Sequence, residues 1–542
     1  MPDAPELHDG PHATPVPHDL PELHDTPVRH EGPLDTPVLI VGAGPTGLVL
    51  AIDLARRGVA CRVLDRAAEP FPGSRGKGVM PRTLEVFDDL GVIEQVLDAA
   101  MLMAVTRFYD RDRLIAELTF VYGRAGESMP YPDALHAPQW RIETILAERL
   151  AALGGVVERG QEFVGLEQDA EAVTATVRDV ATDATRTIRA AYLVGADGGR
   201  STVRKSAGLR FEGHGDPGQV GLIGDVEVEG LSREARYVWS NADHTFLQLC
   251  PLKGTDVWQY SATLAGDEEP GPATFQRLFD AYTGMTGVRL HSPTWLSRFT
   301  VNQRMVDRYR VGRVLVGGDA AHVHSPVSGQ GLNSGVQDAY NLGWKLAMVL
   351  GGAPDRLLDT YEAERLLVAR KVLATSQTGH GALFSTNPLM ALLRRWVLLP
   401  LLTLPPVTRA LLRRLSQIGL HYRESPLSAP GPAGRPRAGD RAPDGTAVQA
   451  GTGTRVRLFD LFRGPHFTLL TTEPIRLDGV VTHHLERVYG TAGCALVRPD
   501  GYLAYRGPAD PRVLRDYLAG LTGSHPAALP TGTGRPRTDT YG

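Results

Sequence analysis

The feature that most constrains this chain of 542 residues is a glycine-rich turn, GAGPTG, at Gly42–Gly47. The compact apolar run Val38–Val41 precedes the turn, an apolar-periodic stretch to Arg57 follows it, and strand-like residues return at Ala60–Leu64. This order predicts a strand, a tight turn, a helix and a second strand, which together make one βαβ unit. A chain with such a unit is expected to have an α/β fold.

The spacing of the glycines in this turn points to a dinucleotide. Gly42 permits the tight turn, Gly44 lets the backbone approach a pyrophosphate, and Gly47 lets the helix pack closely on the strand. The phosphates would then lie at the helix N-terminus, where free N–H groups and the helix dipole favour negative charge. Asp65 ends the next strand, about 20 residues on, where an acid binds ribose hydroxyls. This full context favours a dinucleotide site over a glycine turn without a ligand.

Two further glycine-rich motifs follow predicted strands. GADGGRS at Gly195–Ser201 follows a strand at Tyr192–Val194. GGDAAH at Gly317–His322 follows a buried strand at Val314–Val316 and leads into a long helix, predicted from about Asn333 to Leu350. An aspartate at a strand end can hold cofactor hydroxyls, and a loop that enters a helix presents N–H groups to an anionic edge. Each motif alone is equally consistent with a capped helix start.

Composition excludes several other classes of function. The 57 basic and 61 acidic residues nearly balance, which leaves no electrostatic signature for nucleic acid or an acidic membrane surface. The three cysteines lie far apart and form no CxxC, zinc or disulfide pattern, as is typical of a reducing cytoplasm. The longest apolar run, at Trp396–Leu404, is shorter than the ~20 residues of a spanning helix. We therefore expect a cytoplasmic protein with no metal, membrane or nucleic-acid partner.

The order of the three motifs is more specific than any one of them. It resembles the para-hydroxybenzoate hydroxylase (class A) family of FAD-dependent monooxygenases, over roughly Pro37 to Gln377. Within that family the chain is most similar to the phenol hydroxylase and aromatic polyketide hydroxylase branch. Three short stretches carry this closer similarity: GWKL at Gly343–Leu346, TYEAER at Thr360–Arg365 and LVRPDGY at Leu496–Tyr502.

The resemblance implies a fold of several parts. It implies a Rossmann-like FAD-binding domain interleaved with a mixed-sheet substrate domain, followed by a thioredoxin-like α/β domain at the C-terminus. A linker rich in Pro and Gly at Pro430–Pro443 marks the boundary before that last domain. The predicted parts are a disordered tail at 1–36, the FAD-binding domain at 37–430 with its substrate part at about 210–300 and a helical hairpin at about 376–420, and the C-terminal domain at 431–542.

The resemblance also implies cofactor contacts for residues in and between the motifs. Residues near the first motif would bind the adenosine and pyrophosphate of FAD: Gly42, Gly44, Pro45, Thr46 and Gly47 at the pyrophosphate, Asp65 at the ribose, Arg66 beside the adenine and Arg75 near the phosphates. Later residues would contact the rest of FAD: Gln139 or Arg141 and Asp319 at the ribityl region, and Pro326, Gly329, Gly331, Leu332 and Asn333 along the isoalloxazine.

Some candidates have competing interpretations. Asp197 is implied in FAD and NAD(P)H binding, but it would equally brace its own loop. His322 and His324 look like bases, and a structural hydrogen bond is the favoured interpretation for both. No catalytic base is identified.

Cys494 is the only cysteine of the C-terminal domain, which predicts a domain without dithiol redox activity.

The resemblance implies a reaction in three stages. NAD(P)H gives a hydride to FAD, O2 forms a flavin C4a-hydroperoxide, and an aromatic substrate, phenolic or polyketide-type, takes one oxygen atom. The single GxGxxG motif favours transient docking of NAD(P)H over a second nucleotide domain. Baeyer–Villiger oxidation or epoxidation of a polyketide on the same scaffold stays open, as does a flavin-binding protein without turnover. Association into a homodimer is also left open.

Overall fold

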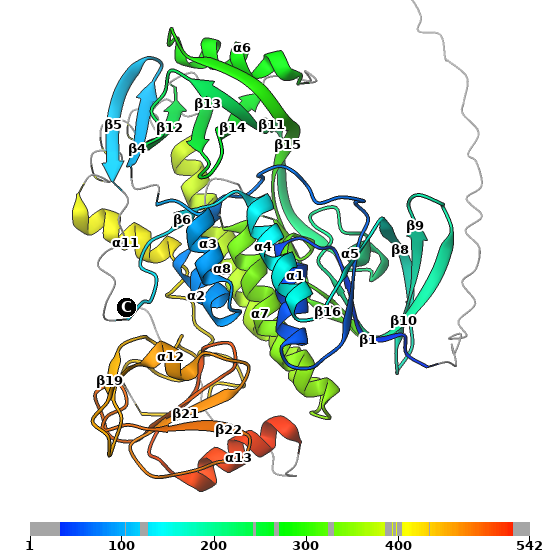
Figure 1. The fold of residues 1–542 in the computed structure, drawn as a ribbon, viewed down its shortest axis with the longest axis vertical. Coiled ribbons are helices and arrows are strands. Elements are labelled where there is room, and N and C mark those ends of the chain that lie inside the picture. The colour runs from blue at the N-terminus through cyan, green and yellow to red at the C-terminus, as the bar shows by residue number, and fades with distance from the viewer. Residues whose placement is uncertain are drawn as a thin grey trace, which may run out of the picture. The chain divides into compact units, whose positions relative to one another are not determined.

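The computed structural model places most of the chain (Figure 1). The described residues are 33–102, 105–119, 128–241, 245–264, 270–323, 330–384, 393, 397, 401, 404–432 and 434–523. The tail predicted at 1–36 lies almost wholly outside them. Among the helices of the described part, none is long and apolar enough to cross a membrane.

A first sheet of eight strands contains the predicted βαβ unit. Strand β1 (Thr36–Val41) pairs in parallel with β2 (Cys61–Asp65), and helix α1 (Pro45–Ala55) connects them. The order β16-β17-β10-β1-β2-β7 forms the main path, and β8 and β9 extend it through β10. Their bounds are β7 (Val157–Arg159), β8 (Gln161–Gln168), β9 (Val173–Asp179), β10 (Thr185–Gly195), β16 (Arg310–Val311) and β17 (Val314–Val316). The predicted α/β fold is confirmed.

Two of the helices beside this sheet, α1 and α7, approach each other closely. Helix α7 (Gly331–Leu350) contacts α1 at two glycines, Gly335 and Gly343. A Cβ on Gly335 would lie 2.3 Å from the Thr46 hydroxyl, and one on Gly343 would lie 2.2 Å from an Asp53 carboxylate oxygen. The other helices and the short pair of strands here are α2 (Pro81–Asp89), α3 (Ile93–Ala99), α4 (Gln139–Ala152), α5 (Thr202–Ser206), η1 (Gly318–Ala320), η3 (Asp355–Leu358), α8 (Asp359–Phe384), α11 (Pro405–Leu415), β3 (Gly78–Val79) and β6 (Leu135–His136).

A second sheet of eight strands extends beyond the range 210–300 that the sequence assigns to the substrate part. Its order is β18-β15-β11-β14-β13-β12-β4-β5. Helix α6 (Pro272–Thr283) covers one face, where Phe275 meets Tyr260 edge to face at 4.9 Å. The strands are β4 (Val105–Asp110), β5 (Arg113–Thr119), β11 (Phe211–Glu229), β12 (Ala235–Ser240), β13 (Phe246–Pro251), β14 (Val257–Leu264), β15 (Arg289–Val306) and β18 (His322–Val323). Strands β4, β5 and β18 come from outside that range.

The C-terminal region has its own sheet of four strands in the order β22-β21-β23-β24. One face packs on α13 (Pro511–Thr522) and on Trp344 of α7, and the other packs on α12 (Leu458–Phe462). The strands are β19 (Thr446–Val448), β20 (Arg455–Arg457), β21 (Phe467–Thr471), β22 (Val480–His484), β23 (Cys494–Val497) and β24 (Leu503–Gly507), of which β19 and β20 form a separate pair. Of the helical hairpin predicted at about 376–420, most of 385–403 lies outside the described residues.

Candidate functional site

Two glycines of the first turn are required by the fold itself. Gly42 has φ +105°, a left-handed conformation that favours glycine, and a Cβ there would lie 2.3 Å from the carbonyl oxygen of Ala196. A Cβ on Gly47 would lie 1.9 Å from the carbonyl oxygen of Gly42. These two positions therefore let β1, α1 and the end of β10 meet.

Gly44 has no such structural reason. Its φ of −76° and ψ of −178° suit any residue, and a Cβ would meet no atom of the described protein within 4 Å. It is the N-cap of α1, a helix with no side-chain cap and no acidic residue in its first turn. A helix N-terminus in that state favours an anion. Gly44 therefore leaves room for a ligand such as the pyrophosphate of a dinucleotide.

Asp65 supports the same turn from the end of β2. Its carboxylate accepts the N–H of Ala43 at 2.9 Å and that of Ala67 at 2.8 Å. A carboxylate has about four lone-pair directions, so these bonds leave capacity for ribose hydroxyls. Arg66 follows it and is exposed. The ribose role of Asp65 and the adenine role of Arg66 stay predictions.

The segment after Phe71 brings several predicted residues near one another. Gln139 accepts the N–H of Gly76 at 2.7 Å, and a Cβ on Gly76 would lie 3.8 Å from a methyl carbon of Leu332. Arg75 is exposed, and its guanidinium stacks over the Phe71 ring at 4.5 Å. Gln139 thus braces this segment against α4 in the structure.

Arg141 and Glu143 follow Gln139 on α4. Arg141 is half-buried and makes no hydrogen bond or ion pair with another described residue. Burial raises the pKa of Glu143, Asp65 raises it too, and Arg75 is among the groups that lower it. Asp65 and Arg75 therefore both act electrostatically on the Glu143 carboxylate.

Asp319 lies where β17 runs into η1. Its side chain is exposed although Gly318 and Ala320 on either side are buried. A Cβ on Gly331 would lie 3.7 Å from its carboxylate, so Asp319 faces the first turn of α7. The surrounding protein raises the pKa of Asp319 by desolvation, while His322 and Arg75 lower it. An accessible carboxylate beside a helix N-terminus suits a polyhydroxylated chain.

The remaining residues predicted near the flavin fall into two groups. Asn333 is buried, accepts the N–H of Met80 at 2.8 Å and donates to the carbonyl of Gly78 at 2.8 Å, so it locks α7 onto the β3 segment. Gly331 and Leu332 begin α7. Pro326, Gly329 and His324 lie outside the described residues.

Asp197 braces its loop in the structure. Its carboxylate accepts the hydroxyl of Ser201 at 2.5 Å and the backbone N–H groups of Thr202 and Val203, which caps α5. Arg204 then donates to the carbonyl of Ala320 at 3.0 Å and ties the second motif to the third. A direct cofactor contact of Asp197 stays a prediction.

His322 belongs to a buried network, as the favoured interpretation expects. Its Nε2 lies 2.7 Å from Asp338, whose carboxylate also binds the guanidinium of Arg365 at 2.6 Å and the N–H of Gly318. Burial would raise the pKa of Asp338, but Arg365 and His322 outweigh it and the pKa is lowered. This network holds the Gly317–His322 turn in shape.

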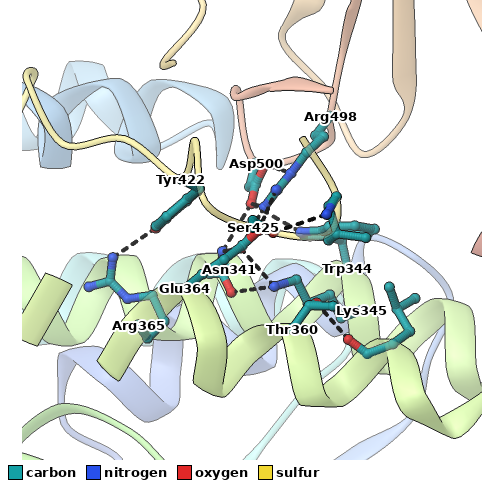
Figure 2. Close-up of polar contacts among 12 residues, drawn as sticks. Asn341, Trp344, Lys345, Thr360, Glu364, Arg365, Tyr422, Ser425, Arg498 and Asp500 are labelled. Atoms are coloured by element: carbon teal, nitrogen blue, oxygen red, sulfur yellow. Dashed lines mark hydrogen bonds and ion pairs between the residues drawn. The ribbon is translucent and has the colours of Figure 1, made fainter. Parts of the chain in front are cut away.

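The three stretches that mark the hydroxylase branch meet in one buried ion cluster (Figure 2). Glu364 accepts the ammonium of Lys345 at 2.8 Å and the guanidinium of Arg498 at 2.6 Å. Arg498 also binds Asp500 at 2.9 Å, and Ser425 donates to Glu364 at 2.6 Å. We call Lys345, Glu364, Arg498 and Asp500 the ion cluster. It joins α7 and α8 to the C-terminal sheet.

Sequence reasoning missed the polar residues on the second sheet. Lys77 donates to Gln259 of β14, and the Nδ1 of His136 lies 3.4 Å from the sulfur of Cys250 on β13. The strand pattern at 210–300 carried no signal for them, because the partners come from distant parts of the chain. They lie where the Gly73–Gly78 segment meets the second sheet.

Two family models match this chain. Residues 35–376 match the family model described as FAD binding domain, and residues 435–524 match the model described as aromatic-ring hydroxylase, C-terminal. A flavin-dependent monooxygenase of Mycobacteroides abscessus is 42% identical over 89% of this chain and 99% of its own length.

Two solved structures are similar over most of their length. Anhydrotetracycline hydroxylase from Streptomyces rimosus has a TM-score of 0.74 and 34% identity, over 90% of this chain and 99% of that chain. Aklavinone-11 hydroxylase in a ternary complex with FAD and aklavinone has a TM-score of 0.75 and 26% identity, over 91% and 100%. Both similarities span the two large sheets and the C-terminal region.

Proposed function

This chain belongs to the FAD-binding, class A family of flavin-dependent monooxygenases, and from that premise we propose that it hydroxylates an aromatic, polyketide-type substrate with NAD(P)H and O2. FAD is its cofactor, and NAD(P)H is the reductant typical of the family. The observation that carries the proposal is the combination of an open Gly44 turn with an accessible Asp319, which faces the first turn of α7.

The protein's own residues would bind and orient the cofactor. Gly44 and the N-terminus of α1 receive the pyrophosphate, and Asp319 binds ribityl hydroxyls. Bound FAD supplies hydride acceptance and oxygen activation. The first turn of α7 favours negative charge beside it by ~0.3–1 kcal/mol, and by up to ~2 kcal/mol in a partly buried site. The second sheet would form one wall of the substrate site and help to exclude water from it.

The substrate class follows from the relatives. The two hydroxylases of known structure are named for anhydrotetracycline and aklavinone. We propose a bulky aromatic substrate of the same kind, bound between the flavin and the second sheet.

The three free cysteines, Cys61, Cys250 and Cys494, support an enzyme that works in the cytoplasm. Association into a homodimer remains part of the proposal.

A turnover assay under air tests the function. NADH or NADPH oxidation is followed with a panel of phenols and polycyclic hydroxyquinones. The masses of the products formed in 18O2 are measured by mass spectrometry. We expect oxidation that depends on the aromatic compound and a product heavier by one labelled oxygen. A ring-expanded product would indicate Baeyer–Villiger oxidation instead of hydroxylation, and an epoxide product would indicate epoxidation. No stimulation by any aromatic compound, with FAD bound, would favour a flavin-binding protein without turnover.

A further inference from the structure

A row of polar side chains crosses a buried face of the second sheet. Asp225 on β11 pairs directly with Gln259 on β14, and Gln259 pairs directly with Cys250 on β13. Residues directly opposite one another on neighbouring strands carry their side chains on the same face. All three are buried, with 0–2% of their surface exposed. Polar groups at this depth require partners.

The partners come from the segment around Arg75, the residue that the sequence places near the FAD phosphates. The backbone N–H of Ser74 donates to Asp225 at 3.1 Å, and the Gln259 amide donates to the carbonyl of Ser74. Lys77 donates from Nζ to the amide oxygen of Gln259. Between them, Gly76 lies next to Gln139 and Leu332. Lys77 therefore joins the second sheet to a segment that contacts Gln139 and Leu332, two residues predicted to contact FAD.

Lys77, which contacts this row, has no opposite charge at ion-pair distance within the described residues. Its ammonium has one hydrogen bond within the described residues, to the neutral amide of Gln259, and no carboxylate there within 4.0 Å. Burial lowers the pKa of Lys77 to about 8, and Arg236 on β12 lowers it further, against Cys250 and Asp225, which raise it. Part of the side chain remains accessible.

None of the other titratable groups that face Lys77 forms an ion pair with its ammonium within the described residues. Burial raises the pKa of the Cys250 thiol, which stays protonated. Burial, followed by Arg236 and Lys77, holds the pKa of His136 well below its usual value, so His136 stays neutral. Desolvation also raises the pKa of Asp225, whose carboxylate is already bound by Ser74.

A second buried lysine in the same chain shows what a compensated site looks like. Burial also lowers the pKa of Lys345 to about 8, but its ammonium lies 2.8 Å from the Glu364 carboxylate. A buried charge is costly unless an opposite charge and hydrogen bonds accompany it. Lys345 has its anion within the protein. No carboxylate of the described protein lies within 4.0 Å of the Lys77 ammonium, so a ligand could supply the paired anion.

We propose that Lys77 binds an ionised hydroxyl of the substrate, so that the enzyme selects aromatic compounds with an acidic phenol or enol. The substrate O–H bond breaks, its proton passes to solvent, and the phenolate oxygen pairs with the Lys77 ammonium. An aromatic ring carrying O⁻ is the more nucleophilic form. Lys77 is in this sense a catalytic and specificity-determining residue, and the inference rests on the proposed hydroxylation.

The test follows ionisation of a bound probe and needs no turnover. Alizarin, a tricyclic hydroxyanthraquinone whose visible spectrum changes when it ionises, is titrated into the oxidised FAD holoenzyme across a range of pH. Difference spectra against the holoenzyme give the pKa of the bound probe. The variants are Lys77→Met, which removes the charge, Lys77→Arg, which keeps it, and Lys253→Met, an exposed lysine as the matched control.

We expect the wild-type enzyme to lower the pKa of alizarin by at least one unit, a tenfold shift in the ionisation constant. Lys77→Met should lose that shift, while Lys77→Arg and Lys253→Met keep it. Lys77→Met should also melt no lower than the wild type, because it removes an uncompensated buried charge. Absence of alizarin binding to the wild type, equal ionisation in Lys77→Met, or a variant that fails to fold each overturns the proposal. Ionisation without oxygenation would instead refute the hydroxylase function and leave this inference standing.

Discussion

Helix α7 carries two polar regions that the protein satisfies in different ways. At its first turn, Asp319 is exposed and has no hydrogen bond to another described residue, and the nearby Gly44 borders open space. Farther along the same helix, Lys345 lies in the ion cluster, where every charge has a partner at hydrogen-bond distance (Figure 2). The first region has the features of a ligand-binding site, and the second stabilises the structure.

This contrast separates residues that bind from residues that stabilise. Both regions are rich in charge, and both contain motifs typical of the family. Burial and pairing distinguish them: Glu364 and Arg498 are 0% exposed and paired with each other, whereas Asp319 is open. A substitution in the ion cluster should therefore change stability, and one at the first turn of α7 should change cofactor affinity.

The largest effect is expected in the ion cluster. Arg498→Met leaves Glu364 and Asp500 buried with less positive charge, and breaking a buried pair on one side costs about 3–5 kcal/mol. Burial disfavours the charged form of Arg498, but Asp500 and Glu364 outweigh it and raise its pKa. Urea unfolding followed by circular dichroism measures the loss.

An exposed arginine provides the control for this variant. Arg178 pairs with Glu162 at 2.5 Å, but its side chain is 44% exposed. Exposed ion pairs contribute little to stability. Arg178→Met should unfold at the wild-type urea midpoint, and an equal loss in both variants would mean that burial of the cluster has no special importance.

The next effect concerns the ligand-binding end of α7. Asp319→Ala should weaken FAD binding by ~1.5–3 kcal/mol, the usual value of a hydrogen bond to a charged group, which is roughly ten- to more than a hundred-fold in Kd. The apoprotein should melt like the wild type, because the carboxylate has no hydrogen bond within the described protein. Flavin fluorescence titration measures the affinity. An unchanged Kd would show that Asp319 has no contact with the cofactor.

The smallest effect is expected at Cys494 in the C-terminal sheet. Its thiol is buried, donates to the carbonyl of Pro508 at 3.5 Å, and burial raises its pKa to about 12. Such a thiol is unreactive at neutral pH. Cys494→Ser should leave substrate-dependent NAD(P)H oxidation and product yield unchanged. A folded variant with collapsed turnover would place the thiol in the reaction.

The local elements of the cofactor region could be predicted from the sequence. The strand expected at Val314–Val316 is β17, and the helix expected from about Asn333 begins two residues earlier, at Gly331. Apolar runs and glycine turns are local signals, so they determine where strands and helices begin. The roles of Gly42 and Gly47 in packing followed from the same spacing.

What the sequence could not show is which polar groups the fold pairs. Arg498 and Glu364 are 134 positions apart, and Lys77 and Gln259 are 182 apart. Such contacts depend on strand register and on how separate sheets meet, which no local pattern encodes. Asp197 was undecided for a different reason, because a local cap and a cofactor contact suit the same motif, and only the structure shows its carboxylate accepting the N–H of Thr202 at the start of α5.

The most direct test of the contrast is FAD binding by Gly44→Val. Valine fits the backbone at this position and meets no described atom within 4 Å at Cβ, so it should cost at most about 1 kcal/mol of helix capping. Apoprotein is titrated with FAD, and thermal unfolding is recorded in parallel. The account predicts an apoprotein that folds like the wild type and does not bind FAD. A folded Gly44→Val protein with wild-type FAD affinity would contradict it.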